Sequence, residues 1–513
     1  MQHVNWTALS VFILLFLLIT VLGFVAAHWR KGDLDLLHEW GLAGRRFGTV
    51  ITWFLIGGDL YTAYTFIAVP ALAFGAGAIA FFAVPYTVMI YPILFLVFPR
   101  LWRVCHKHNY ITASDFVRGR FGNRWLALAV AVTGIVATMP YIALQLVGLQ
   151  VVIGGMGVSG TGYAGDLPLV IAFVILAAFT YTSGLRAPAS IAIVKDILIY
   201  IAAFAAIIYV PIHMGGFGAI FSKVPPAKLL LAPPGPNTTG LYGVYATLAL
   251  GSALALFLYP HSITGILAAN SGHAIRRNAA LLPGYSFMLG LLAMVGLFAL
   301  AAGVSTLPEF AGGFKQFGNN FAVPALYLQM FPSWFVGIAF AAIGIGALVP
   351  AAIMSIAAAN LYTRNIHREF INTDLSDRAE AQIAKWVSLI VKFGALVFIL
   401  FLPEQYAIYL QLLGGILIIQ TLPAVMLGVF TDWFNDWALF AGWLVGIALG
   451  TWMFVAANLT PNFPLSLAGH TFPGYTALYT VILNLLVAVV LTPVFNSLGG
   501  KRMDATVPAD YRA

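Results

Sequence analysis

Long apolar runs separated by short polar breaks recur along almost the whole chain. A run of about 20 apolar residues can cross a bilayer as an α-helix, and the pattern predicts thirteen such spans. We expect helices near residues 5–28, 47–75, 79–99, 125–154, 167–184, 188–211, 241–268, 280–303, 333–362, 385–402, 407–429, 437–457 and 474–495. The first run has no Lys or Arg before it, so we interpret it as a retained helix and not a signal peptide. The predicted fold class is an all-α, multi-pass membrane protein.

The composition agrees with this class. Of the 513 residues, 61% are hydrophobic and only 8% are charged, whereas about a quarter of the residues of a soluble protein are charged. The single cysteine, Cys105, excludes a disulfide framework and a cysteine-based metal cluster. The chain contains no HExxH pair, no G-x-S-x-G elbow and no carboxylate dyad, so we expect neither an enzyme nor a cofactor.

The basic residues are distributed unevenly between the two sides of the predicted membrane. Of the 25 Lys and Arg, three fall in loops of one side and two within spans, namely Lys223, Lys228 and Lys315, and Lys195 and Lys392. The other 20 fall on the opposite side. Because Lys and Arg mark the cytoplasmic side, we expect a bacterial inner (plasma) membrane protein with its N-terminus outside and its C-terminus in the cytoplasm. This bias explains the net charge of +8 without a nucleic-acid partner.

Four spans carry polar or helix-breaking residues that a membrane-crossing helix normally lacks. The second contains IGGDLYTAYTF, the seventh FLYPHSITG, the ninth VPAAIMSIAAAN and the eleventh QLLGGILIIQTLP. Interrupted helices expose carbonyl and amide groups at mid-membrane, where cations and anionic ligands bind. The alternative is that small residues only allow close helix packing. For the second and seventh spans together we favour a binding site.

The second and seventh spans are five helices apart, and five is an odd number. Spans two to six and seven to eleven would therefore form two units of opposite orientation, each beginning with a broken helix, as in inverted-repeat transporters. The expected segments are an N-terminal helix and cytoplasmic loop (1–46), a first repeat (47–211), an external loop (212–240), a second repeat (241–430), and two peripheral helices with a cytoplasmic tail (431–513).

Five stretches resemble one known family. They are GRRFGTVITWFLIGGDLYTAYTFIAVPALAFGAG, YITASDFVRGRFG, PYIALQLVGLQ, LYPHSITGILAANSGHAIRRNAALLPGYSFMLG and TLPAVMLGVFTDWFNDWALFAGWLVGIALG. In this order they resemble the sodium/solute symporter family, and the fourth is similar to its bacterial monocarboxylate permease branch. The resemblance covers nearly all thirteen spans. It implies a LeuT-type 5+5 inverted repeat, alternating access, and a central substrate site with a cation site beside it.

The resemblance also implies a set of cation ligands. These are the carbonyls of Gly57, Leu60 and Ala352 and the hydroxyl of Ser355, with Asp59 beside the site. The sequence departs from the family pattern in two places. Ile356 replaces the second hydroxyl, and Ala192 replaces an aspartate that lines a second sodium site in some members.

Lys195 lies one helical turn after Ala192, on the same face. A buried ammonium can replace a sodium ion and can release and regain a proton. Our hypothesis is that Lys195 stands in for sodium, so that the coupling ion is H+ instead of Na+. The alternative is that Lys195 snorkels to the cytoplasmic surface.

If the chain belongs to the monocarboxylate branch, its substrate is a small anion such as lactate, pyruvate or a short-chain acid. Donors for the carboxylate are expected at the helix breaks, with two glutamines at the edge of the pocket: Tyr61, Thr62, Thr65, Tyr259 and His261, and Gln145 and Gln411. The alternative functions are sodium-coupled symport of a small amino acid such as alanine, and nutrient sensing. Membrane lipids are the other expected partners, and a monomer is compatible with each function.

Overall fold

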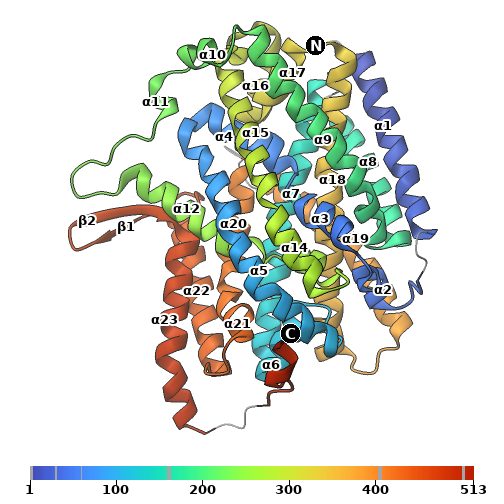
Figure 1. The fold of residues 1–513 in the computed structure, drawn as a ribbon, viewed down its shortest axis with the longest axis vertical. Helices are drawn as coiled ribbons and strands as arrows, with labels where there is room; N and C mark the ends of the chain where they lie inside the picture. The colour runs from blue at the N-terminus through green and yellow to red at the C-terminus, as the bar shows by residue number, and fades with distance from the viewer. Residues whose placement is uncertain are drawn as a thin grey trace.

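The two chain termini lie at opposite ends of a helix bundle in the computed structural model (Figure 1). The structure describes residues 4–28, 32–58, 60–158, 163–401, 407–499 and 503–512. The helices of the first half are α1 (Trp6–Val25), α2 (Leu37–Leu42), α3 (Thr49–Gly58), α4 (Val69–Ala76), α5 (Ala83–Lys107), α6 (Ala113–Phe121), α7 (Arg124–Gly155), α8 (Tyr163–Ser183), α9 (Arg186–His213), α10 (Phe217–Lys223) and α11 (Pro226–Leu229).

The second half continues the bundle and adds a β-hairpin. Its helices are α12 (Gly240–Leu256), α13 (Pro260–Leu267), α14 (Gly272–Leu281), α15 (Pro283–Ala301), α16 (Ala311–Phe317), α17 (Ala322–Met330), α18 (Ser333–Tyr362), α19 (Asp377–Phe401), α20 (Ile408–Ile418), α21 (Leu422–Val425), α22 (Asp436–Ala456) and α23 (Thr476–Ser497). The hairpin strands are β1 (Asn462–Leu467) and β2 (His470–Tyr475). Short helical turns used below are η3 (Tyr64–Ala68), η8 (Thr363–Ile371), η9 (Ile419–Thr421) and η10 (Leu427–Val429).

The described residues contain nine helices that are long and apolar enough to cross a membrane. The number rises to ten when the bent pair α12 and α13 is counted as one span. A multi-pass, mostly helical membrane protein is therefore confirmed, and each predicted range contains helix. The count of thirteen spans stays a prediction, in part because α3 has only 10 residues before it stops.

Two broken helices lie at the positions predicted for the second and seventh spans. In the first, α3 ends at Gly58 and helical structure resumes in η3 and α4. In the second, α12 and α13 are separated by three residues and bent by 48°. Pro260 begins α13, where its missing N–H costs no helical hydrogen bond. The backbone of Tyr259 before it is outside the helical region, so the chain turns there.

The eleventh predicted span corrects one interpretation of the sequence. We expected its paired glycines to interrupt the helix, but α20 runs through Gly414 and Gly415 to Ile418. A Cβ on Gly414 would lie 2.6 Å from the Tyr259 hydroxyl, and one on Gly415 would lie 2.2 Å from the Tyr475 hydroxyl. These glycines therefore make room for two buried tyrosines. They do not break the helix.

The centre of the bundle is built from helices that are distant in sequence. Helix α18 packs against α7, α1 and α9, and α20 packs against α7 (Figure 1). Helix α18 is almost entirely buried, and its run of Gly and Ala allows these close approaches. Both broken helices contact this group, because α9 packs on α3 and α18 packs on α13.

The Pro-rich loop of residues 212–240 and the hairpin contact each other. Thr471 of β2 exchanges backbone hydrogen bonds with Asn237 and Thr239 of the Pro-rich loop. In the same loop, Lys228 donates a hydrogen bond to the carbonyl of Gly75 near the end of α4. The hairpin was not predicted, because its six-residue strands are short and only two of their twelve residues are buried.

The C-terminal tail, residues 503–512, packs against α5 and α6. The Arg120 guanidinium of α6 lies 2.6 Å from the Asp504 carboxylate. The Asp510 side chain is only 1% exposed and forms ion pairs with Lys107 and, at 2.7 Å, with the Nε2 atom of His108. The tail is thus held to the bundle by charged groups.

The buried carboxylate of Asp510 makes tail docking dependent on pH. Burial alone would raise its pKa, but hydrogen bonds from Lys107, His108 and the Val507 N–H outweigh this effect and hold the pKa well below its usual range. A lowered folded-state pKa contributes stability above the unfolded pKa that is lost as the pH falls through the folded value. We expect Asp510→Asn to speed hydrogen exchange of the tail amides about tenfold at pH 7, because hydrogen bonds to charged groups are strong. The exposed Asp374→Asn is the control, and an unchanged rate in Asp510→Asn would contradict the anchor.

Candidate functional site

A buried ion pair lies against the break in the first broken helix. Lys195 and Asp196 of α9 are fully buried, with the lysine nitrogen 3.0 Å from a carboxylate oxygen. The same nitrogen donates to the backbone carbonyls of Gly58 and, at 3.0 Å, of Tyr61. The Tyr285 hydroxyl donates to the other carboxylate oxygen at 2.8 Å. The ammonium thus has two hydrogen-bond acceptors and one ion-pair partner, which offsets part of the cost of burying the charge.

The glycine pair at the end of α3 leaves the space that this cluster occupies. A Cβ on Gly58 would lie 2.9 Å from the Lys195 nitrogen and 3.2 Å from the Asp196 carboxylate. A Cβ on Gly57 would lie 2.6 Å from the Tyr285 ring. Only glycine allows backbone to approach side chains so closely. The pair therefore permits both the break in the helix and the contact with α9 and α15.

The oxygen atoms implied as sodium ligands take part in hydrogen bonds of the protein. The Gly57 carbonyl accepts from the Leu60 N–H at 2.9 Å, and the Leu60 carbonyl accepts from the Thr65 hydroxyl. On α18, the Ser355 hydroxyl donates to the Ala352 carbonyl at 2.8 Å. The lysine nitrogen binds other carbonyls of the same break. The sodium ligand set therefore stays a prediction.

The Lys195 side chain does not snorkel to a surface. It is fully buried and points into the first broken helix, which excludes that alternative. Asp59, which was predicted beside the cation site, lies outside the described residues, so its relation to Lys195 stays a prediction.

Two members of the buried cluster were missed from the sequence. Asp196 follows Lys195 directly, and an acid within a predicted span is itself a sign of function. Tyr285 is 89 residues away along the chain, and no local pattern connects it to the pair.

A second cluster forms where α13 begins. The rings of Tyr259 and His261 are 5.3 Å apart, and the Tyr141 ring of α7 lies 5.3 Å from each of them. The Tyr259 hydroxyl donates to the Gln411 carbonyl of α20 at 2.9 Å. Three helices therefore bring aromatic and polar side chains together at the second helix break.

The two predicted glutamines lie near the helix breaks, and their role in binding a substrate stays a prediction. Gln145 of α7 accepts a hydrogen bond at 3.2 Å from the Ala63 N–H, inside the break of the first broken helix. The side-chain oxygen of Gln411 is buried without a hydrogen-bond partner among the described residues. Because buried polar atoms normally have partners, this oxygen is a candidate contact for a bound molecule. Gln145 thus contacts the first helix break, and Gln411 lies beside the second.

The three hydroxyl residues predicted from the first broken helix bond within the protein. The Tyr61 hydroxyl donates to the Tyr285 carbonyl at 2.9 Å. The Thr62 hydroxyl accepts from the Tyr64 N–H at 3.0 Å, and the Thr65 hydroxyl donates to a carbonyl of its own segment. These bonds shape the unwound backbone, and a direct role in binding a substrate stays a prediction for these residues.

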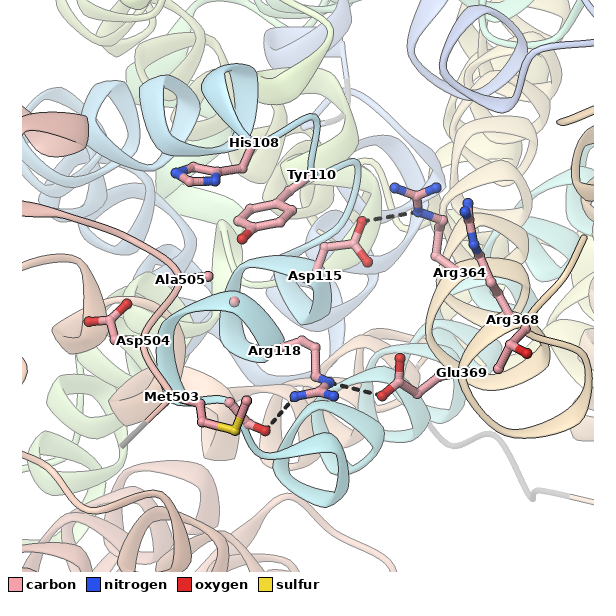
Figure 2. A pocket seen from close by; sticks show the side chains of 13 residues that line it. His108, Tyr110, Asp115, Arg118, Arg364, Arg368, Glu369, Met503, Asp504 and Ala505 are labelled. Atoms are coloured by element: carbon pink, nitrogen blue, oxygen red, sulfur yellow. Dashed lines mark hydrogen bonds and ion pairs between the residues drawn. The ribbon is translucent and has the colours of Figure 1, made fainter. Parts of the chain in front are cut away.

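A larger pocket, of about 700 Å³, opens at the end of the bundle near the C-terminus. Figure 2 shows the Arg118 guanidinium of α6 pointing to Glu369 of η8, at 2.9 Å, and Asp115 pointing to Arg364, at 3.6 Å. These pairs tie α6 to the extension of α18. A cavity lined by Pro260, in contrast, holds only about 20 Å³, which is room for one water molecule.

Comparison with known proteins gives three results. Residues 40–446 match the model of the "Sodium:solute symporter family". The chain is 52% identical over 496 residues to the "Monocarboxylate transport permease protein" of Rhizobium johnstonii, covering 95% of this chain and 97% of that protein. It is 32% identical over 514 residues to the "Uncharacterized symporter YodF" of Bacillus subtilis, covering 98% of both.

One solved structure with the same fold is a Na+-coupled sialic acid symporter in a substrate-bound, outward-open state. Its TM-score is 0.75 over 95% of this chain and 98% of that chain, at 15% sequence identity. At this identity the likeness concerns the fold.

Proposed function

Because this chain belongs to the sodium:solute symporter family, we propose that it takes up small monocarboxylates by proton-coupled symport. The family makes it a multi-pass membrane transporter and not an enzyme, and its fold is of the predicted LeuT-like class. The single observation that carries the ion proposal is the ammonium of Lys195 between two carbonyls of the broken helix.

The buried pair supports coupling to protons. Lys195 places a positive charge at the break, where a cation would otherwise have to bind, and Asp196 and Tyr285 complete its surroundings. A proton that binds to this group from one side of the membrane and leaves it to the other changes the charge held at the break during the cycle. That change can alter the equilibrium between the outward-facing and inward-facing conformations of the transporter. Sodium is not needed for this step.

The second cluster supports a small carboxylate as substrate. Tyr259 and His261 surround the break between α12 and α13 with donors and aromatic surface, and Gln145 lies at the break of the first broken helix. Such groups suit a short apolar acid, because the carboxylate needs donors and the tail needs apolar contact. The name of the Rhizobium relative points to the same class.

We also propose the predicted orientation and division of the chain. The repeats would be residues 47–211 and 241–430, with the N-terminus outside and the C-terminus in the cytoplasm of the plasma membrane. The termini at opposite ends of the bundle support this arrangement (Figure 1).

Uptake into proteoliposomes tests the ion and the substrate together. We expect labelled lactate or pyruvate to accumulate under an inward proton gradient without sodium, and a C2 to C4 acid to compete. Strict dependence on sodium that survives Lys195→Ala would contradict proton coupling. Uptake of alanine in place of the acids would identify the amino-acid alternative. Binding of the acids without uptake would indicate a sensor.

His261→Ala tests the substrate site separately from the ion site. We expect it to reduce uptake at least about tenfold, the effect of losing roughly 1.4 kcal/mol of binding. His470→Ala, an exposed histidine on the hairpin, is the matched control and should leave uptake unchanged. Equal uptake by the two variants would remove His261 from the site.

A further inference from the structure

We propose that a basic pocket near the C-terminus binds a phosphate group, supplied by the headgroup of an anionic phospholipid. The pocket holds about 710 Å³ and lies between α5, α6, α14 and the tail. It is separate from the two clusters at the helix breaks. The charged residues that line it are Arg100, Arg103, Arg120, Arg276 and Arg512, and Asp432 and Asp504.

The positive charges of this pocket exceed its negative charges. Asp504 is already paired with Arg120 at 2.6 Å. The pocket is lined by five arginines and only two aspartates, and Arg103 lies close enough to Arg100 and Arg276 to be repelled by them. An excess of like charges held together favours the binding of an anion.

Aromatic rings hold three of the guanidinium groups in place. The Arg100 guanidinium lies 4.8 Å from the centre of the Phe430 ring, and that of Arg276 lies 5.6 Å from the Phe95 ring. On the tail side, Arg120 lies 5.1 Å from the Tyr511 ring. Planar guanidinium groups fixed by stacking lose little freedom when they bind, and their paired donors match two phosphate oxygens.

The surroundings of the pocket favour a lipid over a soluble anion. Phe95, whose ring the Arg276 guanidinium contacts, is exposed on the surface of the apolar helix α5. Phe430 is exposed beside η10. Trp433 and Trp437 are exposed in the next few residues. Exposed aromatic side chains mark the level of the lipid headgroups. The arginines therefore lie at the depth of lipid phosphates.

Thermal unfolding of the purified full chain in detergent tests the proposal. The probes are phosphatidylglycerol, phosphatidylcholine, inorganic phosphate and sodium lactate at equal ionic strength. We expect phosphatidylglycerol to raise the Tm more than phosphatidylcholine does. Because a basic residue near a lipid surface contributes about 1 kcal/mol, or about fivefold in affinity, Arg103→Gln/Arg276→Gln should weaken the apparent affinity roughly 25-fold.

Arg124→Gln is the matched control. Arg124 is stacked at 5.2 Å on each of two rings, Trp125 and Phe370, but it does not line the pocket. The control should respond to phosphatidylglycerol as the wild type does. If the double variant does not fold, Arg100→Gln replaces it, with an expected weakening of about fivefold.

The remaining outcomes distinguish the source of the phosphate and can overturn the site. If inorganic phosphate as well as phosphatidylglycerol raises the Tm, and the rise depends on the arginines, the phosphate site is supported and a free anion is an alternative occupant. An equal rise of the Tm with lactate would show that the pocket does not select phosphate groups. A shift that is the same in wild type and pocket variants, or no shift with any phosphate probe, would overturn the site itself.

Discussion

Replacing Lys195 by methionine is expected to lower the free energy of unfolding by about 3 to 5 kcal/mol, the usual cost of breaking a buried ion pair from one side. The substitution leaves the Asp196 carboxyl group fully buried without its cationic partner, with the Tyr285 hydroxyl as its remaining donor among the described residues. The carbonyls of Gly58 and Tyr61 lose their donor at the same time. Denaturant unfolding of the purified protein in detergent measures the change.

A double substitution separates the interaction between Lys195 and Asp196 from the cost of leaving one of them buried without its partner. Lys195→Met/Asp196→Leu removes both charges, and its cost should be smaller than the sum of the two single variants, because the two residues interact directly. Lys392→Met is the matched control. Lys392 is also buried in a span, but its nitrogen lies 3.4 Å from the Ser388 carbonyl and near no acid among the described residues. If Lys392→Met lowers the free energy of unfolding as much as Lys195→Met does, the ion pair does not account for the effect of Lys195→Met.

The fold was largely predictable because a bilayer imposes helix on every apolar run. Backbone groups in hydrocarbon must be satisfied within the segment, so hydropathy alone locates the helices. The break at Pro260 was also readable, since proline is favoured at the first position of a helix. The hairpin β1–β2 was not readable, because in a loop outside the membrane no such rule applies.

The paired glycines show where local sequence ceases to be informative. Gly57-Gly58 and Gly414-Gly415 have the same local pattern, but the first pair ends a helix and the second lies within one. The two glycine pairs differ in the side chains that lie against them. The Lys195–Asp196 ion pair and the Tyr285 ring lie against the first glycine pair, and two tyrosine hydroxyls lie against the second. Those partners come from other parts of the chain, so only the tertiary structure identifies them.

The candidate site was predicted in part for the same reason. Lys195 was found because a charge in a span is conspicuous, and Tyr259, His261 and Gln145 were found near helix breaks. Their distribution over two clusters depends on how α9, α13 and α7 pack together. Asp196 was readable as a second charge in the same span and was missed, whereas the contact of Tyr285 with it arises only from packing.

The second large effect is expected at another buried ion pair, outside the two clusters. Glu39 of α2 accepts hydrogen bonds from Arg186, which begins α9, and from Arg46, at 2.8 Å. The Arg186 side chain is 2% exposed and that of Arg46 is 48% exposed. We expect Glu39→Gln to lower the free energy of unfolding by about 3 kcal/mol, because the Arg186 charge is left buried without an acid.

Arg46→Gln provides the matched comparison on the same carboxylate. It removes a half-exposed partner, and exposed ion pairs contribute about 0 to 1 kcal/mol, so we expect a cost of at most about 1 kcal/mol. The same denaturant titration measures both variants. Because Arg186 also donates to the Glu39 carbonyl at 2.8 Å, its side chain should stay in place in Glu39→Gln, and the loss should reflect the charge. Equal costs for the two variants would mean that burial of Arg186 does not set the strength of this contact between α2 and α9.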